Sequence, residues 1–329
     1  MNAEACWTRH WQADVIDACV PDNGQVRSGL DRCWQQFFGR LPDAARLLDL
    51  GTGNGALALR ALVAAERCGR TIEIHGVDAA RIDPARYVAG EQRARLAQVH
   101  FHAGVSIESL PFEADRFDCV VSQYAFEYAD IERAANEVAR VLRPGAPAKF
   151  LVHSADAPVV GEVREALHAM RKIAASALFA SAESLLQRLV AARRAGQGAT
   201  PDIQRQIAAF RSELDVQRAA LCSQQRQGLA GDLLTAVAAL PAQALADPER
   251  APEDWTSELH QRLAAQIERY EDMIHACRDS AGLKSLMDIL VENGLEHVEM
   301  HRAVIDPPGV CTGHWISARG GLQDVHAGA

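Results

Sequence analysis

Short apolar runs alternate with helix-like segments between residues 46 and 153. Each run has the length and composition of a buried strand, and glycine, proline or polar residues mark the breaks between them. The expected strands are 47–50, 72–77, 99–102, 117–122 and 148–153. Because strands joined by helices pair in parallel, the pattern predicts an α/β sheet covered on both faces, with ligands bound outside the carboxyl ends of the strands.

Apolar positions at helical spacing dominate the segments on either side of this core. Residues 1–45 are predicted to form an N-terminal helical extension, in which Trp7 and Trp11 share a helix face. Residues 155–281 are predicted to form an all-helical insertion. Its helices are expected at about 160–194, 202–228, 231–245 and 255–279. A single helix over 160–194 would be about 50 Å long, so this segment must bend, break or protrude.

Strand patterns return near the C-terminus. A helix is expected over 285–293, followed by strands over 295–304 and 312–318 with a turn at 306–309 between them. The resulting domain organisation is a helical extension (1–45), a core with strands 1–5 (46–154), a helical insertion or cap (155–281) and the completion of the core with strands 6 and 7 (282–329).

Composition narrows the classes of partner and the compartment. The net charge of −9 disfavours a nucleic-acid partner, since a polyanion would be repelled. The eight cysteines include no C-x-x-C pair, which fits a reducing cytoplasm better than a disulfide scaffold. No apolar run approaches 18 residues, so a membrane span is not expected. These features predict a cytoplasmic protein.

The candidate ligand site is the turn D-L-G-T-G-N-G at residues 49–55, directly after the first strand. Glycines let the backbone take sharp dihedral angles and let a ligand approach without a Cβ in the way. The same turn also fits the G-x-G-x-x-A dinucleotide fingerprint. Two features favour another nucleotide-type cofactor: Asp49 stands two residues before the first glycine, and Asp78 lies farther along the chain than the ~20 residues of a dinucleotide fold.

Five motifs in order carry a specific resemblance. They are D-L-G-T-G-N-G, G-V-D, L-P-F, F-D-C-V-V-S and L-R-P-G. This succession resembles class I S-adenosylmethionine (SAM)-dependent methyltransferases that modify small molecules, over about 45–153 and 282–321. The resemblance implies a seven-stranded, mostly parallel Rossmann-like sheet with an antiparallel last strand, here with a large all-helical insertion.

The resemblance also implies S-adenosyl-L-methionine as cofactor. Asp49 and the glycine turn would meet its methionine end, and Asp78 would accept hydrogen bonds from both ribose hydroxyls. The family's usual adenine-binding acid is replaced by Ser106, which leaves adenine recognition to the Ser106 hydroxyl, the Ile107 amide or Glu108. The predicted cofactor-binding residues are Asp49, Gly51, Thr52, Gly53, Asn54, Gly55, Asp78, Ala79, Ser106, Ile107, Ser122 and Gln123.

Three residues are candidates for catalysis: His153, Tyr124 and His10. Tyr124 follows the fourth strand and, with Gln123, is expected at the reaction centre. His153 closes the fifth strand and is the first candidate for a general base, although the pattern favours a structural histidine of the core or of a loop. His10 is a weaker second candidate. Together with Trp7 and Trp11, it belongs either to a packing helix or to a flap over the active site.

No metal site is predicted. His297, Glu299 and His301 alternate on one strand face, but strand positions four apart are separated by about 13 Å, too far for ligands of one zinc ion. His100 and His102 have the spacing of a ligand pair, with no third ligand evident in the sequence.

The predicted function is methyl transfer from SAM to an oxygen or nitrogen of a small molecule, with the helical insertion covering the substrate pocket. Two alternatives stay open: a methyltransferase whose insertion docks a protein or RNA partner, and a non-catalytic SAM-binding or assembly protein. The apolar stripes of the insertion predict either mutual packing of its helices or a homodimer.

Overall fold

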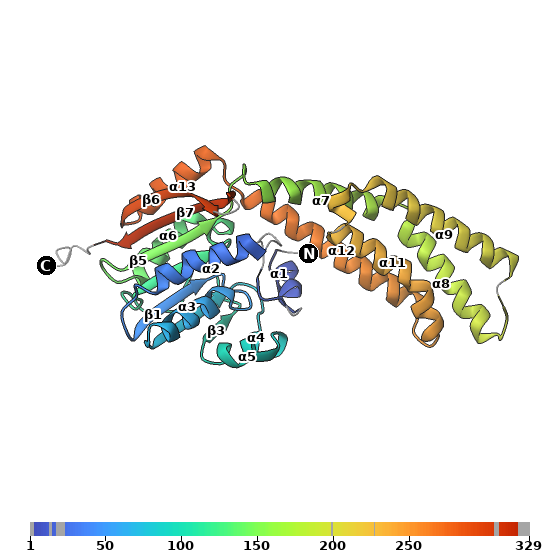
Figure 1. Ribbon diagram of the computed structural model, residues 1–329, viewed down its shortest axis with the longest axis horizontal. Helices are drawn as coiled ribbons and strands as arrows, with labels where there is room; N and C mark the ends of the chain where they lie inside the picture. Colours follow the sequence, from blue (N-terminus) through green and yellow to red (C-terminus); the bar gives the residue numbers. More distant parts are fainter. Residues whose placement is uncertain are drawn as a thin grey trace. The chain divides into compact units, whose positions relative to one another are not determined.

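The computed structural model describes residues 3–12, 15–17, 24–198, 200–226, 228–305 and 309–321 (Figure 1). The chain divides into two compact units. The first unit contains residues 1–161 and 272–329, and the second contains residues 162–271.

Seven strands form one sheet in the first unit. They are β1 (Ala45–Leu50), β2 (Ile72–Asp78), β3 (His100–Ala103), β4 (Cys119–Gln123), β5 (Pro147–Val152), β6 (Leu295–Ile305) and β7 (Val310–Gly320). Their spatial order is β3-β2-β1-β4-β5-β7-β6. Strands β1 to β5 pair in parallel, whereas β7 is antiparallel to both β5 and β6. The predicted fold class is confirmed.

Helices cover both faces of this sheet (Figure 1). The helices of the first unit are α1 (Ala3–Trp11), α2 (Gly24–Phe38), α3 (Ala56–Arg67), α4 (Pro84–Tyr87), α5 (Gly90–Leu96), α6 (Ile131–Val141) and α13 (Ser280–Glu292), with a 3-10 turn at Phe126–Tyr128. Side chains from α2 and α3 pack with Leu47, and side chains from α6 and α13 pack with Leu48. Adjacent residues of β1 therefore face opposite cores, as expected for a strand buried on both sides.

Local differences from the sequence prediction have simple causes. The helix expected to start at Asp83 and Pro84 is only four residues long, although the Asp83 side chain does accept a hydrogen bond from the Arg86 amide. Val88 then takes an extended conformation that ends it. The turn predicted at 306–309 falls largely on residues 306–308, which lie outside the described residues.

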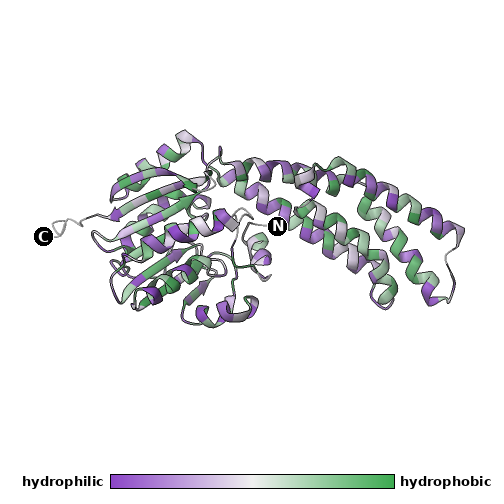
Figure 2. Ribbon diagram, viewed as in Figure 1, coloured by the Kyte–Doolittle hydropathy of each residue, from purple (hydrophilic) through white to green (hydrophobic). Residues whose placement is uncertain are grey.

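The second unit is a helical bundle. It is built from α7 (Pro158–Ala175), α8 (Leu178–Arg194), α9 (Pro201–Ala220), α10 (Ser223–Arg226), α11 (Leu229–Ala246) and α12 (Pro252–Ala276); α7 begins and α12 ends in the first unit. The segment 160–194 is not one helix, because α7 and α8 meet at a 46° bend. The buried side chains of α8, α9, α11 and α12 form one apolar core. Figure 2 shows hydrophobic and hydrophilic positions mixed along these helices, as amphipathic helices require.

One helix in the described part of the chain, α11, has the length and apolar composition of a membrane span. The pair α7 and α8 meets the same criteria only when both are joined across their bend. Leu234, Val237 and Leu240 of α11 are almost fully buried in the bundle. One face of α11 therefore packs into the bundle, and the predicted mutual packing of the apolar stripes is present within the unit.

Candidate cofactor site

A cavity of ≈ 260 Å³ opens at the carboxyl ends of β1, β2 and β4. Among the predicted residues it is lined by Asp49, Gly51, Thr52, Asp78, Ala79, Ser106, Ile107, Gln123 and Tyr124. Residues from other parts of the first unit complete the wall: Trp7, Trp11, Ile16, Asp17, Ala56, Leu57, Ala80, Glu108, Ala125, Tyr128, Ala129 and Asp272. Gly53, Asn54, Gly55, Ser122, His10 and His153 are not part of the lining.

Gly51 brings bare backbone to the cavity, whereas Gly53 lies against the Trp11 ring. Gly51 and Gly53 have φ angles of 65° and 52°, in the left-handed region that other residues rarely adopt. A Cβ on Gly51 would lie 2.2 Å from the Cβ of Ala125, and one on Gly53 would lie 2.4 Å from the Trp11 ring. Both positions therefore require glycine for steric reasons as well as conformational ones.

Asp49 is a buried carboxyl group at this turn. It is 1% exposed and accepts a hydrogen bond from the Thr52 hydroxyl at 2.7 Å. Burial and, to a smaller extent, the nearby Asp78 raise the pKa of Asp49 to about 7, although the Thr52 hydrogen bond lowers it. A carboxylate in this environment is stabilised by a cation placed in the cavity. The ammonium group of SAM fits that requirement.

Asp78 is a predicted cofactor-binding residue that also holds the glycine turn in place. One carboxylate oxygen accepts the Gly53 amide and the other accepts the Ala80 amide, both at 2.8 Å. Burial raises the pKa of Asp78 to about 6 although both hydrogen bonds lower it. Each oxygen keeps a further lone pair for a ligand hydroxyl, so the carboxylate can accept from a ribose diol without releasing the turn.

The segment after β3 and the end of β4 also line the cavity. The Ser106 hydroxyl accepts the Glu108 amide at 3.2 Å, which orders this short segment. Gln123 accepts a hydrogen bond from the Trp34 indole at 2.7 Å through its side-chain oxygen. The amide nitrogen of Gln123 is therefore the part of that side chain left to donate to a ligand.

Aromatic rings from α1 and from the segment after β4 form a further wall. Trp7 stacks with Trp11 at a ring separation of 6.2 Å and meets Tyr128 edge-on at 5.7 Å. The Trp7 indole donates to Asp272 at 2.8 Å. Asn54 donates to the carbonyl of Trp11 and to that of Val15, which ties the end of α1 to the glycine turn. Helix α1 thus both packs against the sheet unit and lines the cavity.

The catalytic candidates occupy different surroundings. Tyr124 lines the cavity, has a φ of 55°, and donates its hydroxyl to the Thr312 carbonyl at 2.9 Å. His153 is fully buried, stacks on the Tyr124 ring at 4.4 Å, and shares a 2.7 Å hydrogen bond with Glu127 through Nδ1. His10 packs against the rings of Trp7 and Trp11.

Several predicted cofactor residues have structural partners instead of a place in the wall. The Ser122 hydroxyl donates to the Leu50 carbonyl at 2.9 Å and is fully buried. Gly55 is the N-cap of α3, and a Cβ there would meet Leu96 and Phe101. Together with Asn54, these residues support the glycine turn from outside the cavity lining.

Sequence reasoning missed several parts of the site. Tyr128 stands only four residues after Tyr124, and this closeness along the chain is the signal that could have found it. Asp272 and the pairing of Glu127 with His153 carry no such signal. Asp272 comes from α12, more than 140 residues along the chain after β4, whose residue Gln123 lines the same cavity. Only the tertiary fold places them beside the predicted residues.

Comparisons with known proteins agree with this geometry. A family model described as a methyltransferase domain matches residues 47–145. An uncharacterized methyltransferase of Mycobacterium bovis is 39% identical over 106 residues, which are 32% of this chain and 39% of that protein. A 2-phytyl-1,4-naphtoquinone methyltransferase of Trichormus variabilis is 32% identical over 148 residues, covering 42% of this chain and 62% of the relative. This chain therefore spans less than two thirds of the length of each.

A solved structure of phosphoethanolamine N-methyltransferase 2 from Haemonchus contortus with SAM aligns with a TM-score of 0.43 and 12% identity, over 89% of this chain and 52% of that one. The assignment depends instead on the observed strand order, the glycine turn after β1 and the match over residues 47–145. By these features the chain carries a class I SAM-dependent methyltransferase domain, with S-adenosyl-L-methionine as its cofactor.

Proposed function

We propose that this protein transfers the methyl group of SAM to an oxygen or nitrogen of a small molecule. The observation that carries the proposal is a single cavity whose wall joins Asp49 and Asp78 on one side to Trp7, Tyr128 and Asp272 on another. Relatives named as methyltransferases of a naphtoquinone and of malonyl-[acyl-carrier protein] support an acceptor group of small size.

The residues around Asp49 and Asp78 would bind and orient SAM. Asp49 and the bare glycine turn would hold the methionine end, and Asp78 would hold the ribose. When bound, SAM supplies an electrophilic methyl group for a direct displacement. The protein's contribution to such a step is alignment of the nucleophile and exclusion of water. Gln123 is a donor with a fixed amide orientation, suited to that alignment.

The acceptor would lie against the aromatic wall. Besides Asp49 and Asp78, three carboxylates line the cavity: Asp17, Glu108 and Asp272. Two of these three have cationic partners, since Asp17 pairs with Arg60 at 3.0 Å and Glu108 pairs with Arg133 at 3.0 Å. Asp272 forms no ion pair with the residues that the structure describes, and its hydrogen bond comes from Trp7. We assign Asp272 as the group that binds a cationic acceptor or accepts its proton.

Tyr124 and His153 fit a positioning role in this proposal. The Tyr124 hydroxyl is used by Thr312, and His153 lies behind the ring of Tyr124, held by Glu127. His153 would act as a base only after Tyr124 moved, so the buried pair of His153 and Glu127 is better suited to fixing the Tyr124 ring. His10 would fix the Trp7 and Trp11 rings in the same way.

The helical second unit is proposed to cover the acceptor site. The support is that Asp272, the first residue of the first unit after the bundle, lines the cavity. A docked protein or RNA partner, or SAM binding without catalysis, are the alternatives. The net charge of −9 disfavours RNA. A cytoplasmic location and a homodimer through the bundle stay predictions. Because the bundle helices bury apolar side chains against one another, a second subunit is less needed to cover them.

The test is an incubation of the protein with methyl-labelled SAM and a metabolite extract. Label should appear in a small-molecule fraction. Asp272→Asn should reduce the transfer strongly without weakening SAM binding. Its neighbour Glu271, which pairs with Arg171 at 2.6 Å in the second unit, offers a matched control, and Glu271→Gln should leave transfer unchanged. Label found only in macromolecules would contradict the small-molecule acceptor.

A further inference from the structure

A cluster of three histidines and a glutamate lies at the edge of the sheet, away from the lining of the cavity. Strands β2 and β3 pair in parallel with His75 opposite His100 and Val77 opposite His102. Because side chains alternate along a strand, Glu73 and His75 share one face of β2, and His100 and His102 share one face of β3. The pairing therefore collects all four side chains on the same side of the sheet.

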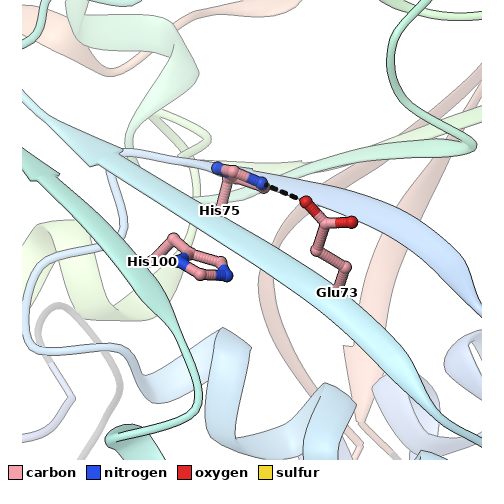
Figure 3. Close-up of side chains that lie close together, drawn as sticks. All are labelled: Glu73, His75 and His100. Carbon is pink, nitrogen blue, oxygen red and sulfur yellow. Dashed lines mark hydrogen bonds and ion pairs between the residues drawn. The ribbon is translucent and has the colours of Figure 1, made fainter.

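The distances within the cluster are short. Nε2 of His75 lies 2.8 Å from the Glu73 carboxylate, and Nδ1 of His75 lies 3.0 Å from Nε2 of His102. One ligand atom from each of Glu73, His75 and His100 lies within 4.8 Å of the other two. Figure 3 shows Glu73 joined to the ring of His75, with the ring of His100 beside both. The rings of His75 and His100 stack at 4.9 Å.

We infer that Glu73, His75 and His100 bind a divalent transition-metal ion such as Zn²⁺. Two imidazoles and one carboxylate form a donor set that zinc accepts, with bonds of about 2.0–2.2 Å. Ligand atoms around such an ion are about 3.3 Å apart, so the contact of Glu73 with His75 needs little opening. Glu73 and His100 are exposed, and their side chains are free to close on the ion, whereas His75 is buried and fixed.

His102 completes the site without binding the ion. A histidine bound to a metal usually donates its other ring N–H to a neighbouring acceptor, which fixes its orientation. The 3.0 Å contact of His75 with His102 supplies that acceptor. The fourth coordination position would be open to solvent, because Glu73 and His100 are exposed and β3 is the edge strand of the sheet.

The cationic side chain of Arg116 lies where it would compete with a metal ion for Glu73 and His75. Its guanidinium lies 3.7 Å from the Glu73 carboxylate and 3.5 Å from Nε2 of His75, and it also stacks over Phe112. Binding of an ion requires Arg116 to leave Glu73. The arrangement therefore makes a distinctive prediction: neutralising Arg116 should strengthen metal binding, whereas neutralising Glu73 should weaken it.

The test is a calorimetric titration of the metal-free full chain with Zn²⁺ at neutral pH. One ion should bind per chain at the cluster. Glu73→Gln and His100→Asn should weaken this binding more than 100-fold, and His102→Ala should weaken it about 10–100-fold. Arg116→Gln should tighten it several-fold. These variants should retain SAM binding, which shows that they fold.

His301→Asn is a matched control, because His301 is an exposed histidine 3.7 Å from Glu299 on the other edge strand of the same sheet. It should bind zinc as the unaltered protein does. Equal zinc affinity in the unaltered protein, Glu73→Gln and His100→Asn would overturn the assignment and leave only adventitious binding by other histidines. Unchanged or weaker binding in Arg116→Gln would overturn the proposed competition between arginine and metal.

Discussion

The affinity for SAM should depend on pH through Asp49. Burial raises the pKa of this carboxyl to about 7, so about half of the cofactor-free protein carries it protonated near neutral pH. Only the ionised form attracts the ammonium group of SAM. The pKa of Asp49 is raised in the folded protein, and binding of a cation lowers it again. The affinity for SAM must therefore increase as pH rises through 7.

The magnitude follows from the same value. If the bound state requires ionised Asp49, the dissociation constant of SAM should be about 25-fold larger at pH 5.5 than at pH 7.5. Asp78, with a pKa of about 6, would contribute about fourfold over the same range. Asp49→Asn should remove the larger effect and leave the smaller one. Calorimetric titration of SAM at the two pH values measures both.

The same carboxyl should lower the stability of the cofactor-free protein. A group with a raised folded-state pKa stabilises the fold at pH values below its unfolded pKa, and this stabilisation is lost as pH rises from 3.8 towards 7. Ionising Asp49 in the folded state therefore costs about 4 kcal/mol at pH 7.5. Asp49→Asn should raise the melting temperature of the cofactor-free protein at that pH while weakening SAM binding. A pH-independent affinity, or an unchanged pH dependence in Asp49→Asn, would refute this reasoning.

Three further predictions concern the rest of the site. Asp78→Asn should weaken SAM binding about 100-fold, because the amide side chain keeps one acceptor oxygen for the amides of Gly53 and Ala80 and loses the other; unchanged binding would reduce Asp78 to an organiser of the turn. His153→Ala should reduce turnover by about tenfold with an unaltered pH–rate profile if it positions Tyr124, whereas a loss of about 10²–10⁴ with a changed profile would identify it as the base. Replacing residues 162–271 by a short linker should preserve SAM binding and abolish transfer, and normal turnover in that variant would contradict the covering role of the bundle.

The sequence predicts those parts of the molecule that depend on neighbours along the chain. Apolar runs located β1 to β5, and the ordered motifs placed Asp49 and Asp78 at strand ends that the fold then brings to one cavity. Their positions follow from local patterns, since the carboxyl ends of parallel strands converge.

Features that depend on contacts between distant segments were not predictable. His100 and His102 were recognisable as a pair, but His75 and Glu73 join them only through the register of β2 with β3. Asp272 reaches the cavity from beyond the whole helical bundle. Ser122 stands next to a cavity residue along the strand, yet alternation turns its hydroxyl to the Leu50 carbonyl. The glutamate beside His153 is likewise set by the fold.

A crystal structure of the full chain with S-adenosylhomocysteine would test the proposed cofactor site most directly. We expect the ligand in the cavity at the carboxyl ends of β1, β2 and β4. Its ribose hydroxyls should lie within hydrogen-bonding distance of the Asp78 carboxylate, and its amino group on the side of Asp49. Trp7, Tyr128 and Asp272 should remain accessible to an acceptor beside the ligand sulfur. Density for the ligand outside this cavity, or a ribose that makes no contact with Asp78, would contradict the proposed site.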